Sequence, residues 1–126
     1  MFFRCLLSKD IVNEKIVKFP FDENKVWNAS LQRDDLPRND LKKQVILQKI
    51  TEGLSFDRVY LETEIKQHIK QFFSESTTIR RELVNFGYMN RNPREGTYIL
   101  VKRNLTIKDI RNNTLLAQHA KSYGIE

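Results

Sequence analysis

Between Arg38 and Val101, apolar residues recur first with the spacing of helices and then with that of strands. The clearest run predicts a helix that begins at Asn39 or Asp40 and ends at Gly53. Its apolar residues share one stripe about 100° wide, which is the width of a surface that faces a core. These residues are Ile46, Leu47, Ile50 and Leu54.

Two more helices are predicted, and a short polar turn separates them. The first covers about Leu61 to Phe73 and follows a short extended stretch at residues 55–60. Its apolar residues recur at helical spacing, and they are Leu61, Ile65, Ile69 and Phe72. The second covers Thr78 to Phe86, and Gly87 is well placed as its left-handed C′ residue.

The next two segments favour strands. Tyr88–Arg91 and Thr97–Val101 flank a turn that contains Pro93 and Gly96, a pattern typical of a β-hairpin. The order helix, short strand, helix, tight turn, helix, hairpin is that of a winged helix-turn-helix. We therefore predict an α+β, mainly α fold with a winged-helix domain at residues 38–103.

The segment before this domain carries a weaker pattern. Ser8 is a candidate cap for an extra N-terminal helix, which Pro20 ends. The apolar residues of this helix are Val12, Ile16 and Phe19. Residues 21–36 are mixed and polar, and a short strand around Val26 fits them. We expect residues 1–37 to form this helix and an extended lead-in that pack on the core.

The segment after the domain predicts a helical tail at residues 104–126. Thr106 and Asp109 have the spacing of a capping box, which opens a weakly amphipathic helix toward Lys121.

The net charge of +6 is unevenly distributed. Residues 78–103 hold six basic side chains against two acidic ones, whereas the rest of the chain is nearly balanced. A local basic cluster is expected of a surface that binds a polyanion. The alternative is a solvated face of a basic protein.

The basic cluster coincides with the polar face of the helix before Gly87. If Ile79, Leu83 and Phe86 are buried, the opposite face suits the major groove, because arginine pairs with guanine and asparagine with adenine. Arg81 and Asn85 would then point to base edges, Arg80 to phosphate, and the hairpin would act as a wing. The predicted DNA-binding residues are Thr77, Thr78, Arg80, Arg81, Asn85, Arg91, Arg94, Lys102 and Arg103.

A second interpretation stays open. Many winged helices are protein-docking or dimerisation modules without DNA affinity, and the run Arg80-Arg81-Glu82 would also suit local ion pairs. The partner is then a second copy or another protein rather than duplex DNA.

The segment IRRELVNFGYMNR at residues 79–91 resembles the signature of the domain of unknown function 2087 family, L-R-R-E-L-V-D-Y/F-G-L-L-x-R. A second motif of that family is similar to YLETEIKQHI at residues 60–69. The family occurs alone and at the C-terminus of ArsR-type bacterial transcription regulators. The resemblance implies a winged-helix-like domain and a role in transcription regulation.

This chain departs from the family at two places. Lys66 replaces an asparagine, and Phe72-Phe73-Ser74-Glu75 stands where the family has F-H-x-D. The missing histidine and aspartate make a metal or small-molecule site less expected here.

Catalytic chemistry finds no support in the residues. His68 is expected to be half-buried beside the apolar face of its helix, His119 stands apart in the tail, and Cys5 has no CxxC partner. No Gly-rich loop precedes a helix. We expect a non-enzymatic protein without a cofactor, a metal ion or a small-molecule ligand. No apolar run reaches the roughly 20 residues of a membrane helix, so a cytoplasmic protein is expected.

Overall fold

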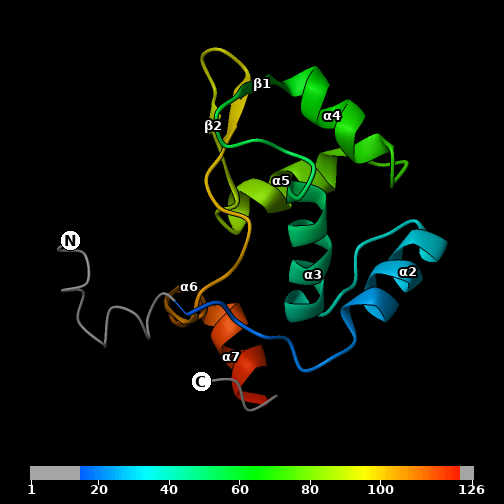
Figure 1. Ribbon diagram of the computed structural model, residues 1–126, viewed down its shortest axis with the longest axis vertical. Helices are drawn as coiled ribbons and strands as arrows, with labels where there is room; N and C mark the ends of the chain where they lie inside the picture. The colour runs from blue at the N-terminus through cyan, green and yellow to red at the C-terminus, as the bar shows by residue number, and fades with distance from the viewer. Residues whose placement is uncertain (1–14, 123–126) are drawn as a thin grey trace, which may run out of the picture. The chain divides into compact units, whose positions relative to one another are not determined.

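The computed structural model describes residues 15–122 of the chain. Two units are distinguished, and each is described by itself. The larger unit is Phe21–Arg103, and the smaller one combines residues 1–20 with residues 104–126. The described structure is α+β and mainly helical, with one small antiparallel sheet (Figure 1).

Helix α3 (Asp40–Thr51) is the central helix of the larger unit, and both α2 and α5 pack against it (Figure 1). Its first turn is capped by Asn39, whose Oδ1 accepts from the N–H groups of Leu41 at 2.9 Å and Lys42 at 3.0 Å. The predicted apolar stripe is confirmed, since Ile46, Leu47 and Ile50 are fully buried. Leu41 and Val45 are fully buried as well, so the helix is enclosed on more than one side.

The predicted strand around Val26 is wrong, because residues 23–33 form helix α2 (Glu23–Arg33). Asp22 caps this helix by accepting from Asn24 N and Lys25 N at 3.0 and 3.2 Å. Trp27 packs edge-on against Phe72 and Phe73, with ring centroids 5.3 and 5.9 Å apart. The helix was missed because its fully buried residue is Ser30, so the sequence shows no apolar stripe.

The sheet contains β1 (Val59–Leu61), β2 (Met89–Asn92) and β3 (Thr97–Leu100) in the order β1-β3-β2. All pairs are antiparallel, and Tyr98 lies opposite both Tyr60 and Arg91. The predicted hairpin is confirmed. Helix α4 (Glu62–Lys70) begins directly after β1, so Leu61 caps the helix and is exposed rather than part of its apolar stripe.

Helix α5 (Thr77–Asn85) is followed at once by the first hairpin strand. The Gly87 N–H donates to the Val84 carbonyl at 3.0 Å, and the Tyr88 N–H donates to the Leu83 carbonyl at 2.9 Å. These two bonds form a Schellman motif, which requires a left-handed residue. Gly87 has φ of 85°, which confirms its predicted role.

In the smaller unit, the expected N-terminal helix is wrong over residues 15–19, and residues 8–14 lie outside the described part. Ile16 instead forms an antiparallel bridge with Thr106, supported by a 2.9 Å bond from Val17 N to Leu105 O. The β-branched residues Ile16 and Val17 favour an extended backbone, and Pro20 restricts Phe19 to one.

The tail of the smaller unit is helical, as predicted, but it forms two helices rather than one, with a break at Asn112 and Asn113. Thr106 and Asp109 form the expected capping box at the start of α6 (Ile107–Arg111), and α7 (Thr114–Ser122) follows. No helix within residues 15–122 is long and apolar enough to cross a membrane.

Candidate nucleic-acid interface

Helix α5 separates a buried stripe from a polar face. Ile79 and Leu83 are 3% and 1% exposed, and Phe86, just past the helix end, is half-buried. On the opposite side Thr77, Thr78, Arg81 and Asn85 are exposed. The rotation predicted from the sequence is therefore that of the folded helix.

Glu75 holds the start of α5. Its carboxylate accepts from Thr77 N at 2.5 Å and from Thr78 N at 3.1 Å, in place of a cap from Ser76. A hydrogen bond from the Thr78 side chain and these backbone bonds hold the pKa of Glu75 below its ordinary value, although burial acts in the opposite direction. The N–H groups of the first turn are thus partly occupied by the protein itself.

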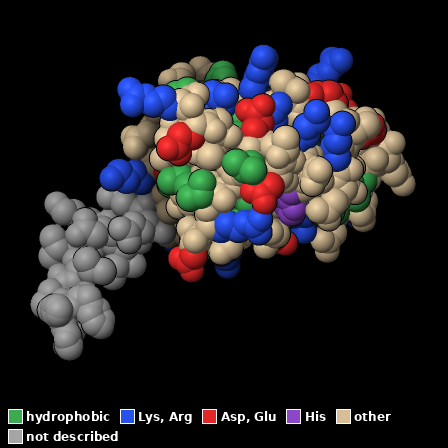
Figure 2. All heavy atoms as spheres, turned by 90° about the horizontal axis from the view of Figure 1, so that it is seen from above, with side chains coloured by type: hydrophobic (Ala, Val, Ile, Leu, Met, Phe, Trp, Pro, Cys, Tyr) green, Lys and Arg blue, Asp and Glu red, His purple; other side chains and the backbone are tan. Residues whose placement is uncertain are grey.

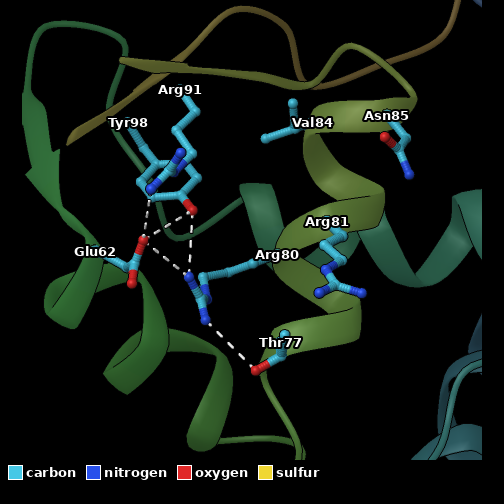
Figure 3. Close-up of a pocket in the computed structure, with 8 residues that line it drawn as sticks. All are labelled: Glu62, Thr77, Arg80, Arg81, Val84, Asn85, Arg91 and Tyr98. Atoms are coloured by element: carbon cyan, nitrogen blue, oxygen red, sulfur yellow. Dashed lines mark hydrogen bonds and ion pairs between the residues drawn. The ribbon is translucent and has the colours of Figure 1, made fainter. Parts of the chain in front are cut away.

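An open groove of about 420 Å³ lies between the polar face of α5, the hairpin and the start of α4 (Figure 3). It brings together five of the nine predicted residues. The lining side chains are Glu62, Thr77, Arg80, Arg81, Val84, Asn85, Arg91 and Tyr98. Thr78, Arg94, Lys102 and Arg103 do not line it.

A cluster around Glu62 ties the three elements of the groove together (Figure 3). Glu62 Oε1 lies 3.2 Å from Arg80 Nη1 and 3.5 Å from Arg91 Nη2. The Tyr98 hydroxyl donates to the same oxygen at 3.4 Å and accepts from Arg80 Nη1 at 3.3 Å. The Arg80 side chain is only 15% exposed, so its charge is largely neutralised inside the groove.

Arg81 and Asn85 point away from the Glu62 cluster (Figure 3). The Arg81 side chain forms no hydrogen bond or ion pair with any residue of the described chain, whereas Asn85 Nδ2 donates to Glu82 Oε1 at 3.1 Å. Glu82 Oε2 binds Lys43 of α3 at 2.7 Å, so Glu82 does not neutralise its neighbours Arg80 and Arg81.

Lys43 is held at the junction of α3 and α5. Burial alone would lower its pKa, but the hydrogen bonds and negative charges of Glu82 and Asp40 outweigh burial and raise the pKa above its ordinary value. This ion pair fixes the exposed face of α5 relative to the core helix.

The three remaining predicted cations lie outside this groove. Arg94 is exposed in the turn of the hairpin, where Asn92 Oδ1 accepts from its N–H at 3.0 Å. Arg103 is half-buried and donates to the carbonyls of Thr51 and Leu54 at the end of α3. Lys102 lies over the ring of the buried Tyr88, 5.7 Å from its centroid.

Sequence reasoning missed Glu62 and Tyr98 as members of the site. Tyr98 is at an inward-facing position of its strand, and Glu62 follows Leu61 at the start of a helix. A structural role therefore accounts for the presence of each residue without a binding site. Their approach to Arg80 depends on sheet register, which the sequence pattern does not contain.

His68 is half-buried, as expected, and its Nε2 lies 2.8 Å from the Ile50 carbonyl. A carbonyl oxygen only accepts, so Nε2 carries the proton and donates. Within residues 15–122, no group of three His, Cys, Asp or Glu side chains is arranged to hold a metal ion. Cys5 lies outside the described residues.

The surface charge is mixed rather than uniform. Figure 2 shows basic side chains spread over one face with acidic ones interspersed, and apolar side chains that reach the surface between them. The face drawn in Figure 2 therefore presents separate cations rather than a continuous positive field.

The sequence model of one family matches residues 34–100, which is more than half of the chain. The family is described as an uncharacterized protein conserved in bacteria, the domain of unknown function 2087. The match runs from the residues before α3 to the end of β3, so it includes every element that builds the groove. No curated protein and no solved structure matches the chain. The chain therefore belongs to the domain of unknown function 2087 family.

Proposed function

We propose that residues 38–103 are a winged helix-turn-helix. The element order α3, β1, α4, α5, β2, β3 and the sheet order β1-β3-β2 support this assignment. In it, α4 and α5 are the helix-turn-helix pair, residues 71–76 are the turn, and the β2–β3 hairpin is the wing.

This module binds duplex DNA with α5 in the major groove, without enzymatic activity or a cofactor. The observation that carries the proposal is the exposed face of α5, where the Arg81 side chain has no partner in the described chain and lies one helical turn from Asn85, in a groove that the hairpin also lines. Arg81 and Asn85 read base edges, while Thr77 and Thr78 contact the backbone. Arg94 approaches the neighbouring minor groove from the hairpin turn.

Arg80 has a different role from that of Arg81. Because Glu62, Tyr98 and Thr77 bind its guanidinium, it connects α5 to the hairpin and sets the angle between helix and wing. Arg91 combines a structural contact with an exposed charge, because it binds Glu62 and its side chain is still 41% exposed.

A fluorescence titration with randomised duplex at low salt tests the proposal. The wild-type chain binds, and Arg81→Glu abolishes binding. Arg94→Ala removes one cation of the wing from the DNA and lowers the slope of log K against log salt by about one. Arg33→Glu is the charge-matched control, because Arg33 is exposed on α2 and does not line the α5 groove. Absence of binding by the wild-type chain would refute DNA recognition.

Transcription regulation in a bacterial cytoplasm is the biological role that this activity would serve. The description of the family as conserved in bacteria supports the setting. Genome-wide capture of the DNA bound by the tagged protein in cells, with Arg81→Glu as the control, would identify the target.

A protein-docking or dimerisation module without DNA affinity is the second candidate. The outer face of the sheet supports it, because Val59 and Ile99 are register partners and are 60% and 43% exposed, with Leu61 beside them at 55%. Apolar side chains grouped in this way are typical of interaction surfaces. Light scattering tests whether a dimer forms through this face. If the wild-type chain has the mass of a monomer and Val59→Ser and Ile99→Ser leave that mass unchanged, no dimer forms there.

A further inference from the structure

A second groove of about 450 Å³ lies between α2 and the start of α3, on elements that the proposed DNA interface does not use. Its floor is apolar and consists of Phe21, Val26, Ala29 and Pro37. Pro37 is buried, and the other three are partly exposed, so apolar surface remains open to solvent.

Four cations surround this apolar floor. Lys25 and Arg33 come from α2, Arg38 directly precedes the N-cap of α3, and Lys42 lies in the first turn of α3. None of them forms an ion pair with a residue of the described chain. The lining carboxylate, Asp22, already uses its Oδ1 to accept from two N–H groups of α2. Four like charges around one groove repel one another, and an anionic occupant relieves that repulsion.

We propose that this groove is a docking site for an acidic peptide segment that carries a large apolar side chain. The apolar side chain packs against Phe21, Val26 and Ala29, and the carboxylates on either side of it pair with the cations of α2 and α3. The pairing of the four cations with the carboxylates orients the peptide in the groove. The contact between its apolar side chain and the apolar floor gives specificity for this peptide.

The shape and chemistry of the groove favour a peptide over other anions. It is an open groove, whereas a small-molecule site normally encloses most of its ligand. Duplex DNA offers little apolar surface to the floor, because phosphate and sugar form its outside and its apolar thymine methyl groups lie within the major groove. The inference does not depend on DNA binding, since α5 contributes no residue to this groove.

The test uses the full chain and a fluorescein-labelled twelve-residue peptide in which aspartates and glutamates flank one phenylalanine and one leucine. Fluorescence anisotropy should show saturable binding with a 1:1 stoichiometry that weakens as salt is added. Replacing both apolar residues of the peptide by serine should weaken binding by about tenfold or more, because buried apolar anchors dominate such contacts.

Three variants locate the site. Arg33→Glu combined with Arg38→Glu should weaken peptide binding by about tenfold or more, since each exposed pair contributes modestly and two are reversed. Ala29→Trp fills the groove without changing the charge and should weaken binding to a similar extent. Arg81→Glu, on the exposed face of α5, should leave peptide affinity unchanged. Circular dichroism confirms that each variant is folded.

Each contrary result has a distinct meaning. No saturable binding of the acidic peptide to the wild-type chain overturns the proposal. Equal weakening by Arg81→Glu and by the α2–α3 pair shows attraction by net charge alone and also overturns it. Displacement of the peptide by duplex DNA from the Arg81→Glu variant would assign the groove to nucleic acid instead. Failure of DNA to bind the wild-type chain leaves the peptide result unaffected.

Discussion

Asp34 has a left-handed backbone, with φ of 57°, at the end of α2. Asparagine and aspartate adopt this region more readily than other side chains, but it is still unfavourable for them. The carboxylate compensates by accepting from the N–H and the hydroxyl of Ser74 in the α4–α5 connection. One residue therefore ends α2 and fastens the turn before α5.

The hydrogen bonds from Ser74 lower the pKa of Asp34 below its ordinary value of 3.8. A lowered folded-state pKa means that the ionised form stabilises the fold at pH values above 3.8. That contribution is lost as the pH falls through the folded-state pKa. We expect Asp34→Asn to melt below the wild type at pH 7, with a difference that shrinks below about pH 4.

Melting curves between pH 2 and pH 7 check this expectation. Asp57→Asn is the control, because Asp57 is exposed and its carboxylate accepts no hydrogen bond within the described chain. A constant difference in melting temperature across the whole range would show that the charge of Asp34 has no part in it. Asp34→Ala should destabilise more than Asp34→Asn at pH 7, since alanine lacks both the acceptor and the tolerance of positive φ.

Gly53 is needed for space rather than for backbone freedom. A Cβ atom placed there would lie 2.5 Å from Cε1 of His68, whose Nε2 donates to Ile50. Gly53 therefore does not lie in a loose connection, because α4 brings the imidazole against it. Gly96 differs, since a Cβ there would meet nothing within 4 Å, although its φ is 66°.

Gly53→Ala should destabilise the protein by about 1–3 kcal/mol, because the added methyl must displace a hydrogen-bonded ring. In a His68→Ala background the same change should cost much less, or even stabilise through lower unfolded-state entropy. The double-mutant cycle, measured by urea unfolding, should give a coupling free energy on the order of 1 kcal/mol. Additive effects would mean that the ring moves aside freely.

At the scale of elements, α5 depends on its buried face for stability, and its exposed face carries the proposed DNA contacts. Leu83→Ala should lower the free energy of unfolding by about 2–5 kcal/mol, since this side chain is 1% exposed. Arg81→Ala should change it by less than about 0.5 kcal/mol, because the guanidinium is exposed. Arg80→Ala should lie between them, at about 1–2 kcal/mol, because it removes charged hydrogen bonds from a partly buried cluster.

Chemical denaturation of the three variants ranks these effects. If Arg81→Ala destabilised as strongly as Leu83→Ala, the orientation of α5 would be wrong and the proposed DNA-facing surface with it.

The junction between α5 and the hairpin depends on Gly87. Gly87→Val should destabilise by about 1–2 kcal/mol, because a β-branched residue is strained at positive φ. Gly87→Asn should cost less, since asparagine tolerates the left-handed region. Equal melting temperatures for the two variants would indicate that the junction relaxes into another turn.

The elements that the sequence predicted are those whose stability comes from their own periodic pattern. Helices α3, α4 and α5 each carry an apolar stripe, and the hairpin carries its turn residues, so they were found within a few positions. Helix α2 was not predicted from the sequence. It packs through Trp27 against the rings of Phe72 and Phe73, just past the end of α4, and these residues lie far from α2 in the sequence. The bridge of Ile16 to Thr106 is equally non-local.

Only part of the candidate site could be predicted from the sequence. The polar face of α5 follows from helical spacing alone. The binding of Arg80 by Glu62 and Tyr98 does not, because it requires the register of the sheet and the start of α4 to bring three distant residues together.

At the scale of the whole molecule, charge is distributed differently in space and in sequence. Residues 78–103 carry the excess charge in the sequence, but Arg80 binds Glu62 and Arg103 binds carbonyls of the core helix. Conversely, residues 25–42 have little excess charge, yet α2 and α3 gather four of their cations around one groove. The fold thus divides one basic sequence into two surfaces.

The division into two units predicts how the chain tolerates truncation. The Ile16–Thr106 bridge and the bond from Ile107 N to Lys15 O both lie within the smaller unit. Removing residues 1–20 and 104–126 together leaves neither strand unpaired, and the larger unit retains its buried residues of α3, α4 and α5. The fragment 21–103 should therefore unfold cooperatively on its own.

Removing residues 104–126 alone should make the chain more prone to aggregation than removing both terminal segments. It leaves Val17, which is 5% exposed in the folded chain, without the Leu105 carbonyl that its N–H binds. We expect the 1–103 chain to aggregate more readily than the 21–103 fragment, because an extended apolar segment with unpaired backbone groups favours intermolecular pairing. Thermal unfolding followed by circular dichroism, with light scattering at the same protein concentration, compares the two. A non-cooperative transition in the 21–103 fragment would show that the larger unit needs the smaller one in order to fold.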